Sequence, residues 1–154
     1  MTHKLLFLHG WLSDGSRKTA FLRSLGYEVR TPLLDEWFWW LAVQVAQLQF
    51  EFFKPDAVVG ISRGAAVAMN MDTSDTPLVL LAPAWKVWGK ADTVKPGTIV
   101  IHSLHDRMIS YAHSVDLCSR SGAALVTAGK DHRLNCPEGQ KALAEALERL
   151  IGTP

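Results

Sequence analysis

The pattern Gly-x-Ser-x-Gly occupies residues 60–64 and places Ser62 at its centre. A valine-containing run over 56–59 precedes the pattern, and the small residues of 64–68 follow it. This order predicts a strand, a very tight turn and a helix, with the serine at the apex of the turn. A serine hydroxyl is a poor nucleophile until a base removes its proton during attack. The pattern therefore predicts a nucleophile and requires a base elsewhere in the chain.

The two glycines of the pattern have a steric explanation. The predicted strand and helix pass so close to each other that a Cβ atom at Gly60 or Gly64 would clash. Ser62 must then adopt a strained backbone conformation, which costs on the order of 1–3 kcal/mol and persists only where its surroundings enforce it. A glycine-rich turn with an ordinary serine is the alternative, but the flanking strand and helix patterns favour the nucleophile.

A carboxylate and a histidine follow in the order that such a nucleophile needs. Asp106 and His132 each stand on a loop directly after a predicted strand. Histidine is the usual base near neutral pH, and a carboxylate on its second ring nitrogen fixes the tautomer and stabilises the imidazolium. The order Ser62, Asp106, His132 is the one expected for a serine on a strand-to-helix turn.

Other residues could fill these two roles. Asp106 could instead cap the helix predicted near Tyr111, and Asp131 could be the acid. Asp131 is adjacent to His132 and cannot easily reach its far ring nitrogen, so we favour Asp106. None of the other histidines combines the required order with a loop after a strand: His3 is near the terminus, His9 belongs to its own loop, His102 is within or at the end of a strand, His105 neighbours the acid, and His113 is on a helix.

Strand and helix patterns alternate along the chain. The apolar runs predict strands over 4–8, 27–31, 56–59, 77–81, 98–102 and 123–127. Helices are predicted over 18–25, with Asp14 or Ser16 as its cap, over 36–53, from the serine turn to about 71, over 111–120, and from Pro137. The strands are continuously apolar, which is typical of strands buried on both faces. We therefore expect an α/β domain spanning 1–154, with a doubly wound, mainly parallel six-stranded sheet and helices on both faces.

The bulk properties exclude several function classes. The 154 residues are 48% apolar and carry a net charge of +1, so no electrostatic footprint for nucleic acid or an anionic membrane is present. The apolar run Leu5 to Leu8 is too short for a signal peptide or a membrane span. Cys118 and Cys136 form no metal-binding spacing, and so few cysteines predict a reduced, cytoplasmic protein. We expect both to be buried thiols.

The sequence resembles the α/β-hydrolase superfamily, and more narrowly its short bacterial serine esterases that lack a lid. The resemblance runs through nearly the whole chain and rests on Leu-His-Gly-Trp at 8–11, Gly-Ile-Ser-Arg-Gly at 60–64, His-Asp-Arg-Met-Ile at 105–109 and Lys-Asp-His at 130–132. It implies that the backbone amide of Arg63 is one oxyanion donor and that of Trp11, with Leu12 as an alternative, is the second. The linker 82–97, where relatives often insert a lid, is too short for a lid domain. Ser103 and Ser110 replace a glycine and a proline that are frequent around the acid in relatives.

All six tryptophans fall on or near loops at the expected carboxyl edge of the sheet, where ligands bind in such folds. The 36–53 helix carries more aromatic residues than one buried face can hold, so part of its surface should meet substrate or a second copy of the chain, as a homodimer. We expect an apolar acyl or aryl pocket lined by Leu12, Trp37, Trp40, Trp85 and Trp88. The Arg63 side chain could meet a substrate carboxylate, but a structural pairing with a nearby acid is the better expectation.

These expectations describe a serine hydrolase acting on carboxylic esters or thioesters of small apolar substrates. Such a reaction needs no metal and no organic cofactor. Two alternatives stay open at this point. Acyl transfer could run on the same triad, and a ligand-binding module could keep the fold without turnover.

Overall fold

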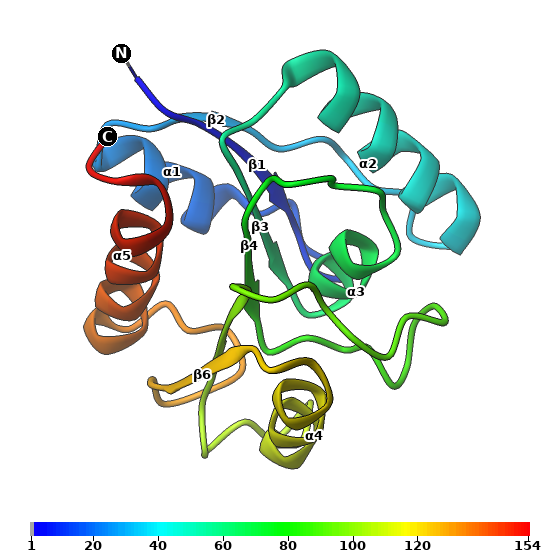
Figure 1. Ribbon diagram of the computed structural model, residues 1–154, viewed down its shortest axis with the longest axis vertical. Coiled ribbons are helices and arrows are strands. Elements are labelled where there is room, and N and C mark those ends of the chain that lie inside the picture. The colour runs from blue at the N-terminus through cyan, green and yellow to red at the C-terminus, as the bar shows by residue number, and fades with distance from the viewer. Residues whose placement is uncertain (1) are drawn as a thin grey trace.

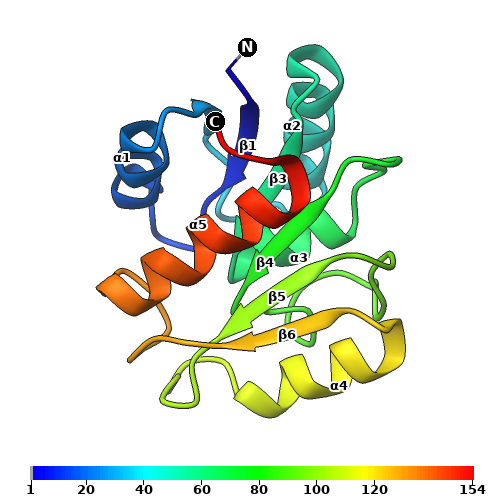
Figure 2. The same cartoon turned by 60° about the vertical axis from the view of Figure 1, so that its left-hand side comes forward.

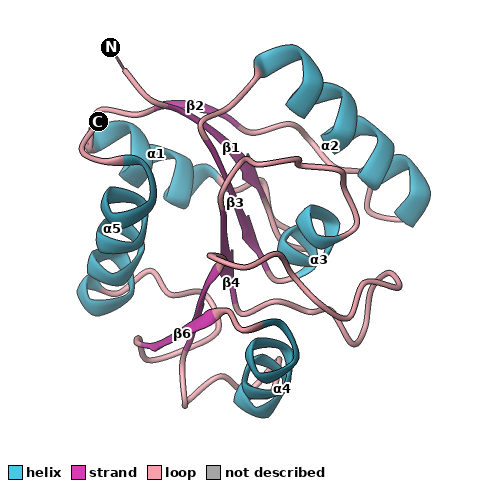
Figure 3. Ribbon diagram, in the orientation of Figure 1, coloured by secondary structure: helices cyan, strands magenta, loops and turns pink. Residues whose placement is uncertain are grey.

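The computed structural model describes residues 2–154, and these form a six-stranded sheet whose neighbouring strands all run parallel. The strand order across the sheet is β2-β1-β3-β4-β5-β6. Figure 3 labels these strands except β5, and Figure 2 shows β5 between β4 and β6. The strands are β1 Lys4–Leu8, β2 Glu28–Arg30, β3 Ala57–Ile61, β4 Leu78–Leu81, β5 Ile99–His102 and β6 Ala124–Thr127. Each matches a predicted strand to within two residues at either end, and the expected parallel sheet is confirmed.

Helices cover both faces of this sheet. Helices α1 (Ser16–Ser24) and α5 (Pro137–Ile151) lie on one face, and α2 (Trp39–Phe53), α3 (Arg63–Met69) and α4 (Tyr111–Ser121) lie on the other (Figures 1 and 2). Alternate residues of one strand serve the two layers. Leu5 and Phe7 of β1 join the core beneath α1 and α5, whereas Leu6 and Leu8 join the core beneath α2 and α3. Each fully buried side chain of this kind contributes about 1.5–3 kcal/mol, which explains why the strands are apolar on both faces.

Two helix starts differ from the prediction. Helix α2 begins at Trp39 rather than at residue 36, because the Asp35 carboxylate accepts the amides of Trp37 and Phe38 and holds them in a turn. At the start of α1, Gly15 takes the N-cap position in a left-handed conformation, and no side chain caps the helix. The expected cap residue Asp14 instead accepts the Ser16 amide in a local turn.

Because the strands are parallel, their carboxyl ends meet at one edge, and the loops that follow them carry the predicted site residues. Segment 82–98, between β4 and β5, contains turns but neither helix nor strand, as expected. No helix within residues 2–154 combines the length and the apolar character needed to cross a membrane.

Candidate active site

Ser62 lies between β3 and α3 in a conformation with a positive φ angle, with φ 56° and ψ −117°. Non-glycine residues rarely adopt this region, and holding one there costs on the order of 1–3 kcal/mol. Three backbone hydrogen bonds enforce it. The Ser62 amide donates to Leu81 O at 2.9 Å, and its carbonyl accepts the amides of Ala66 at 3.2 Å and Ala84 at 3.1 Å. Ser62 is therefore held on a sharp turn by the ends of β4 and α3.

The glycines around Ser62 allow the close approach that the sequence predicted. A Cβ atom on Gly60 would lie 2.7 Å from the Ala65 Cα atom, and one on Gly64 would overlap the carbonyl oxygen of Leu8. Contacts this short with backbone atoms cannot be relieved by a rotamer change. Glycine at both positions therefore lets α3 start directly against β1 and β3.

Asp106 and His132 lie side by side, although 26 residues separate them in the chain. His132 Nδ1 donates to Asp106 Oδ2 at 2.6 Å. The Asp106 side chain is fully buried and that of His132 is 10% exposed. Because Nδ1 is engaged, Nε2 is the ring nitrogen left to accept a proton from a hydroxyl. Asp131, the alternative acid, instead accepts the amides of Arg133 and Leu134 within its own loop.

The third contact of a Ser–His–Asp triad is not formed here. Within residues 2–154, no hydrogen bond joins the Ser62 hydroxyl to His132. In free enzymes such contacts are often long and tighten only in the substrate complex. The complete triad therefore stays a prediction that rests on the placement of its three members at one sheet edge.

The Asp106 carboxylate accepts four hydrogen bonds. Oδ1 accepts the amides of Met108 and Ile109, each at 2.8 Å, and Oδ2 accepts His132 and also His102 Nε2 at 3.0 Å. Burial alone would raise the pKa of Asp106, but the bonds from the Ile109 amide, His132 and the Met108 amide outweigh it and lower the pKa below its usual value. Asp106 is therefore ionised at neutral pH.

His102 is the part of this arrangement that sequence reasoning missed. Its position at the end of a predicted strand argues against His102 as the general base and indicates no other role. The signal that could have found it is its residue type, since a polar side chain that closes an apolar strand needs a buried partner.

The two serines that replace frequent residues of relatives both make hydrogen bonds. Ser103 Oγ donates to Gly129 O at 2.8 Å and so ties the acid loop to the loop that carries His132. Ser110 is the N-cap of α4, and its side chain accepts the Ala112 amide. These departures therefore contribute to the geometry of the site.

The loop after β1 packs against Ser62. A Cβ atom on Gly10 would lie 3.5 Å from the Ser62 Cβ atom. Within residues 2–154, the backbone amides of Trp11 and Arg63 donate no hydrogen bond, so both are available to an oxyanion. The Leu12 amide donates to Glu36 Oε2 at 2.9 Å, which favours Trp11 over Leu12 as the second donor.

The Arg63 side chain is a structural element rather than a substrate ligand. It is 1% exposed, and its guanidinium lies 4.8 Å from the Trp88 ring and 5.6 Å from the Trp39 ring. Its Nη2 atom donates to Asp35 O at 2.6 Å. Burial lowers the pKa of Arg63, opposed by the nearby carboxylates of Glu36 and Asp35. This packing favours a structural role for the Arg63 side chain over a contact with a substrate carboxylate.

The tryptophans divide into three groups. The first group is Trp88, Trp39 and Trp11: the Trp88 ring stacks on that of Trp39 with 5.8 Å between centroids, and its centroid lies 6.3 Å from that of Trp11. Trp37 and Trp40 are 79% and 60% exposed.

Trp85 departs from the expectation of a pocket-lining residue. It is buried, and its indole donates to His113 O at 2.9 Å, so it packs in the core against α4.

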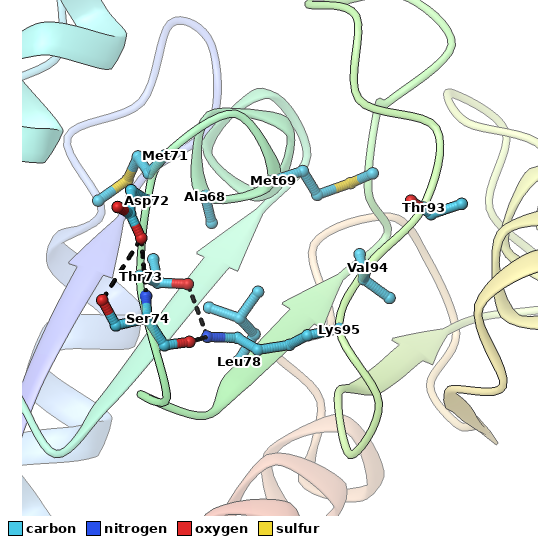
Figure 4. Close-up of a pocket in the computed structure, with 10 residues that line it drawn as sticks. All are labelled: Ala68, Met69, Met71, Asp72, Thr73, Ser74, Leu78, Thr93, Val94 and Lys95. Carbon is cyan, nitrogen blue, oxygen red and sulfur yellow. Dashed lines mark hydrogen bonds between the residues drawn. The ribbon is translucent and has the colours of Figure 1, made fainter.

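A hollow of about 220 Å³ lies at the opposite end of β4 from Ser62 (Figure 4). Met69 and Lys95 are among the residues that line it, and Lys95 Nζ donates to Thr73 Oγ1 and Ser74 O, which belong to the same lining. Its lining contains none of the predicted site residues. Across residues 2–154, no group of three or more His, Cys, Asp or Glu side chains is arranged to hold a metal ion.

Comparison with solved structures supports the fold. The chain superposes on alpha/beta hydrolase domain-containing protein 10 from mouse with a TM-score of 0.76 at 14% identity, covering 98% of this chain and 90% of that one. An α/β-hydrolase enzyme from the metagenome of lagoon sediments at Mar Chica, Morocco, gives 0.74 at 16% identity, covering 97% and 92%. A lidless α/β serine hydrolase from Xanthomonas campestris gives 0.69 at 18% identity, covering 100% and 86%. No family model matches the chain, and no curated protein matches it.

Proposed function

We propose that the chain is a serine hydrolase that cleaves carboxylic esters or thioesters of small apolar substrates. It has the α/β-hydrolase fold, as its motifs predicted, and its structural neighbours include serine hydrolases and esterases at low sequence identity. The observation that carries the proposal is the pairing of His132 with the buried Asp106 carboxylate, together with the positive φ angle of Ser62 on its sharp turn. A fold alone does not define a reaction, so the proposal depends on these side chains.

The proposed reaction has two halves. Ser62 Oγ attacks the carbonyl carbon while His132 Nε2 takes its proton, and the amides of Arg63 and Trp11 bind the oxyanion. His132 then returns the proton to the leaving oxygen or sulfur, and an acyl-serine forms. Water, deprotonated by His132, attacks this ester and releases the carboxylic acid and the free serine. Asp106 stabilises the imidazolium in both halves without taking a proton itself.

A fluorophosphonate probe tests the proposal directly, because it reacts only with an activated serine. Intact mass should show one adduct on wild type and none on Ser62→Ala or His132→Ala. His105→Ala is the matched control, since His105 is exposed on the loop beside the acid and should leave labelling unchanged. Absence of an adduct on folded wild type would contradict the proposal and favour a binding module. A positive result leads to a chain-length series of esters and thioesters.

A further inference from the structure

A second histidine shares the carboxylate on which the proposed base depends. His102, the last residue of β5, is fully buried. Its Nε2 atom lies 3.0 Å from Asp106 Oδ2, the same oxygen that accepts His132, and 3.0 Å from Ile109 O. Its Nδ1 atom lies 2.6 Å from the hydroxyl of Ser114 on α4. Every polar atom of the ring therefore has a partner.

These partners determine which ring nitrogen carries the proton. Nε2 faces an ionised carboxylate and a carbonyl, and neither can donate a hydrogen bond, so Nε2 must be the donor. Nδ1 then accepts from the Ser114 hydroxyl, which can act as the donor in that pair. The contacts thus assign the neutral Nε2–H tautomer to His102.

The surroundings also favour the neutral form. Burial lowers the pKa of His102, although the Ile109 carbonyl and Asp106 act in the opposite direction. The titratable groups that face the ring are Asp106, His132 and Tyr111, whose ring meets His102 edge-on at 5.7 Å. A neutral donor orients the carboxylate without adding a second cation that would compete with the His132 imidazolium.

We propose that His102 is a positioning residue for the proposed hydrolysis, and that it aims Asp106 Oδ2 at His132 through an Nε2–H bond fixed by Ser114. The inference rests on the proposed function. With four donors on its two oxygens, the carboxylate cannot rotate without breaking bonds in a buried site, where an unpaired polar group is costly. His102 touches no reacting atom. It also draws charge density from Oδ2 and so moderates the support that Asp106 gives to the imidazolium.

Two substitutions at residue 102 separate this role from simple packing. His102→Phe keeps a ring but removes the donor, whereas His102→Gln keeps an N–H group close to the position of Nε2. We expect His102→Phe to lower kcat on a chromogenic ester by about 10- to 100-fold with little change in KM, as for other small misplacements of catalytic groups. His102→Gln should recover most of this loss. Ser114→Ala, which leaves the Nε2 donor in place, should have a smaller effect than His102→Phe.

The pH profile gives a readout that packing alone would not change. Without the His102 bond, the negative charge on Oδ2 is shared with one donor fewer, so the His132 imidazolium gains stability. The acid limb of kcat/KM should therefore move to higher pH in His102→Phe and return toward wild type in His102→Gln. Thermal unfolding of each variant records the loss of stability separately.

Proton and nitrogen NMR spectra test the positioning role even if the protein has no hydrolase activity. We expect the Nε2–H tautomer for His102 at neutral pH. The downfield His132 Nδ1–H resonance should persist in His102→Gln and broaden or disappear in His102→Phe. Lack of a probe adduct on wild type would refute the proposed function alone. An unchanged Nδ1–H resonance or acid limb in folded His102→Phe, or a His102→Gln variant as impaired as His102→Phe, would overturn the role of His102.

Discussion

The two sides of the candidate site differ in which kinds of side chain are buried and which are exposed. At the end of β5 and on the loops after β5 and β6, polar side chains are buried, and those of His102 and Asp106 are both fully inaccessible. On the loops after β1 and β2, apolar side chains are exposed, with Leu12 at 71% and Trp37 at 79%. The acid side therefore buries polar groups, and the aromatic side exposes apolar groups to solvent.

This difference assigns different tasks to the two sides. A buried polar group must be paired, because leaving it unpaired costs roughly 2–7 kcal/mol, so hydrogen bonds fix the acid side in one geometry. The exposed aromatic side has no such constraint. There, the Arg63 guanidinium lies beside the stacked rings of Trp39 and Trp88 and supports them, and the outer residues are free to contact a ligand. The comparison predicts chemistry on the acid side and substrate selection on the aromatic side.

The largest expected effect is at the acid. Asp106→Asn should lower kcat by about 10³- to 10⁴-fold, because an amide in place of the carboxylate favours the wrong tautomer of the histidine and cannot stabilise its cation. The measurement is kcat on an ester that the wild type cleaves. Asp131→Asn is the matched control from the adjacent loop and should retain most activity. If the two variants lost activity equally, the Asp106–His132 pairing would not be the catalytic one.

The next effect is on stability, at the close contact between α3 and the end of β1. Gly64→Ala should lower the free energy of unfolding by about 3 kcal/mol, the upper end of the range for overpacking, because its Cβ atom would overlap Leu8 O and neither backbone can move freely. Gly10→Ala, whose Cβ atom finds ordinary contacts, should change the unfolding free energy much less. Denaturant unfolding measures both. Equal losses would show that α3 can withdraw from β1.

How far the sequence predicted this molecule depends on the kind of interaction. The six strands and the serine turn follow from local patterns, apolar runs and flanking glycines, so their placement was predictable. The pairing of Asp106 with His132 required only the order of loops along a parallel sheet. His102 was not predicted, because its role depends on how the loop after β5 and helix α4 fold back over the end of that strand, which brings Asp106, Ile109 and Ser114 to its ring. The burial of Trp85 was not predicted for a related reason, since the hydrogen bond from its indole to His113 O is a tertiary contact.

A smaller effect is expected where α1 supports the histidine loop. Lys18 is buried, and its Nζ atom donates to Arg133 O at 2.5 Å and to Asn135 Oδ1 at 2.7 Å. Lys18→Met should lower the unfolding free energy by about 1–3 kcal/mol, because both acceptors lose their donor. Lys141→Met, at an exposed position, is the control.

The pH dependence of the Lys18 variant has a defined sign. Burial lowers the pKa of Lys18 to about 8, whereas an unfolded lysine titrates near 10.4. Between these values the unfolded state binds more protons, so this group makes wild type more stable as pH rises. The stability gap between wild type and Lys18→Met should therefore widen across that interval. A gap that narrows would contradict the assigned environment of Lys18.

The smallest stability effect, and the clearest test of substrate selection, is at the exposed aromatic residues. Trp37→Ser and Trp40→Ser should each change the unfolding free energy by no more than about 0.5 kcal/mol, because their rings already face solvent. If these rings bind the apolar part of a substrate, both substitutions should lower kcat/KM for a long-chain ester more than kcat/KM for an acetate ester. Asp106 variants should lower kcat/KM for the two esters by the same factor.

Phe52→Ser provides the control, because Phe52 is 83% exposed near the far end of α2, away from the carboxyl edge of the sheet. It should leave the chain-length ratio unchanged. Sedimentation of the same three variants separates substrate binding from the predicted dimer through residues 36–53. If all three variants lose the dimer and keep the chain-length ratio of kcat/KM, the aromatic side serves self-association. An altered ratio confined to Trp37→Ser and Trp40→Ser would assign it to the substrate, since of the three residues only these two lie near Glu36, which accepts the Trp11 indole and the Leu12 amide.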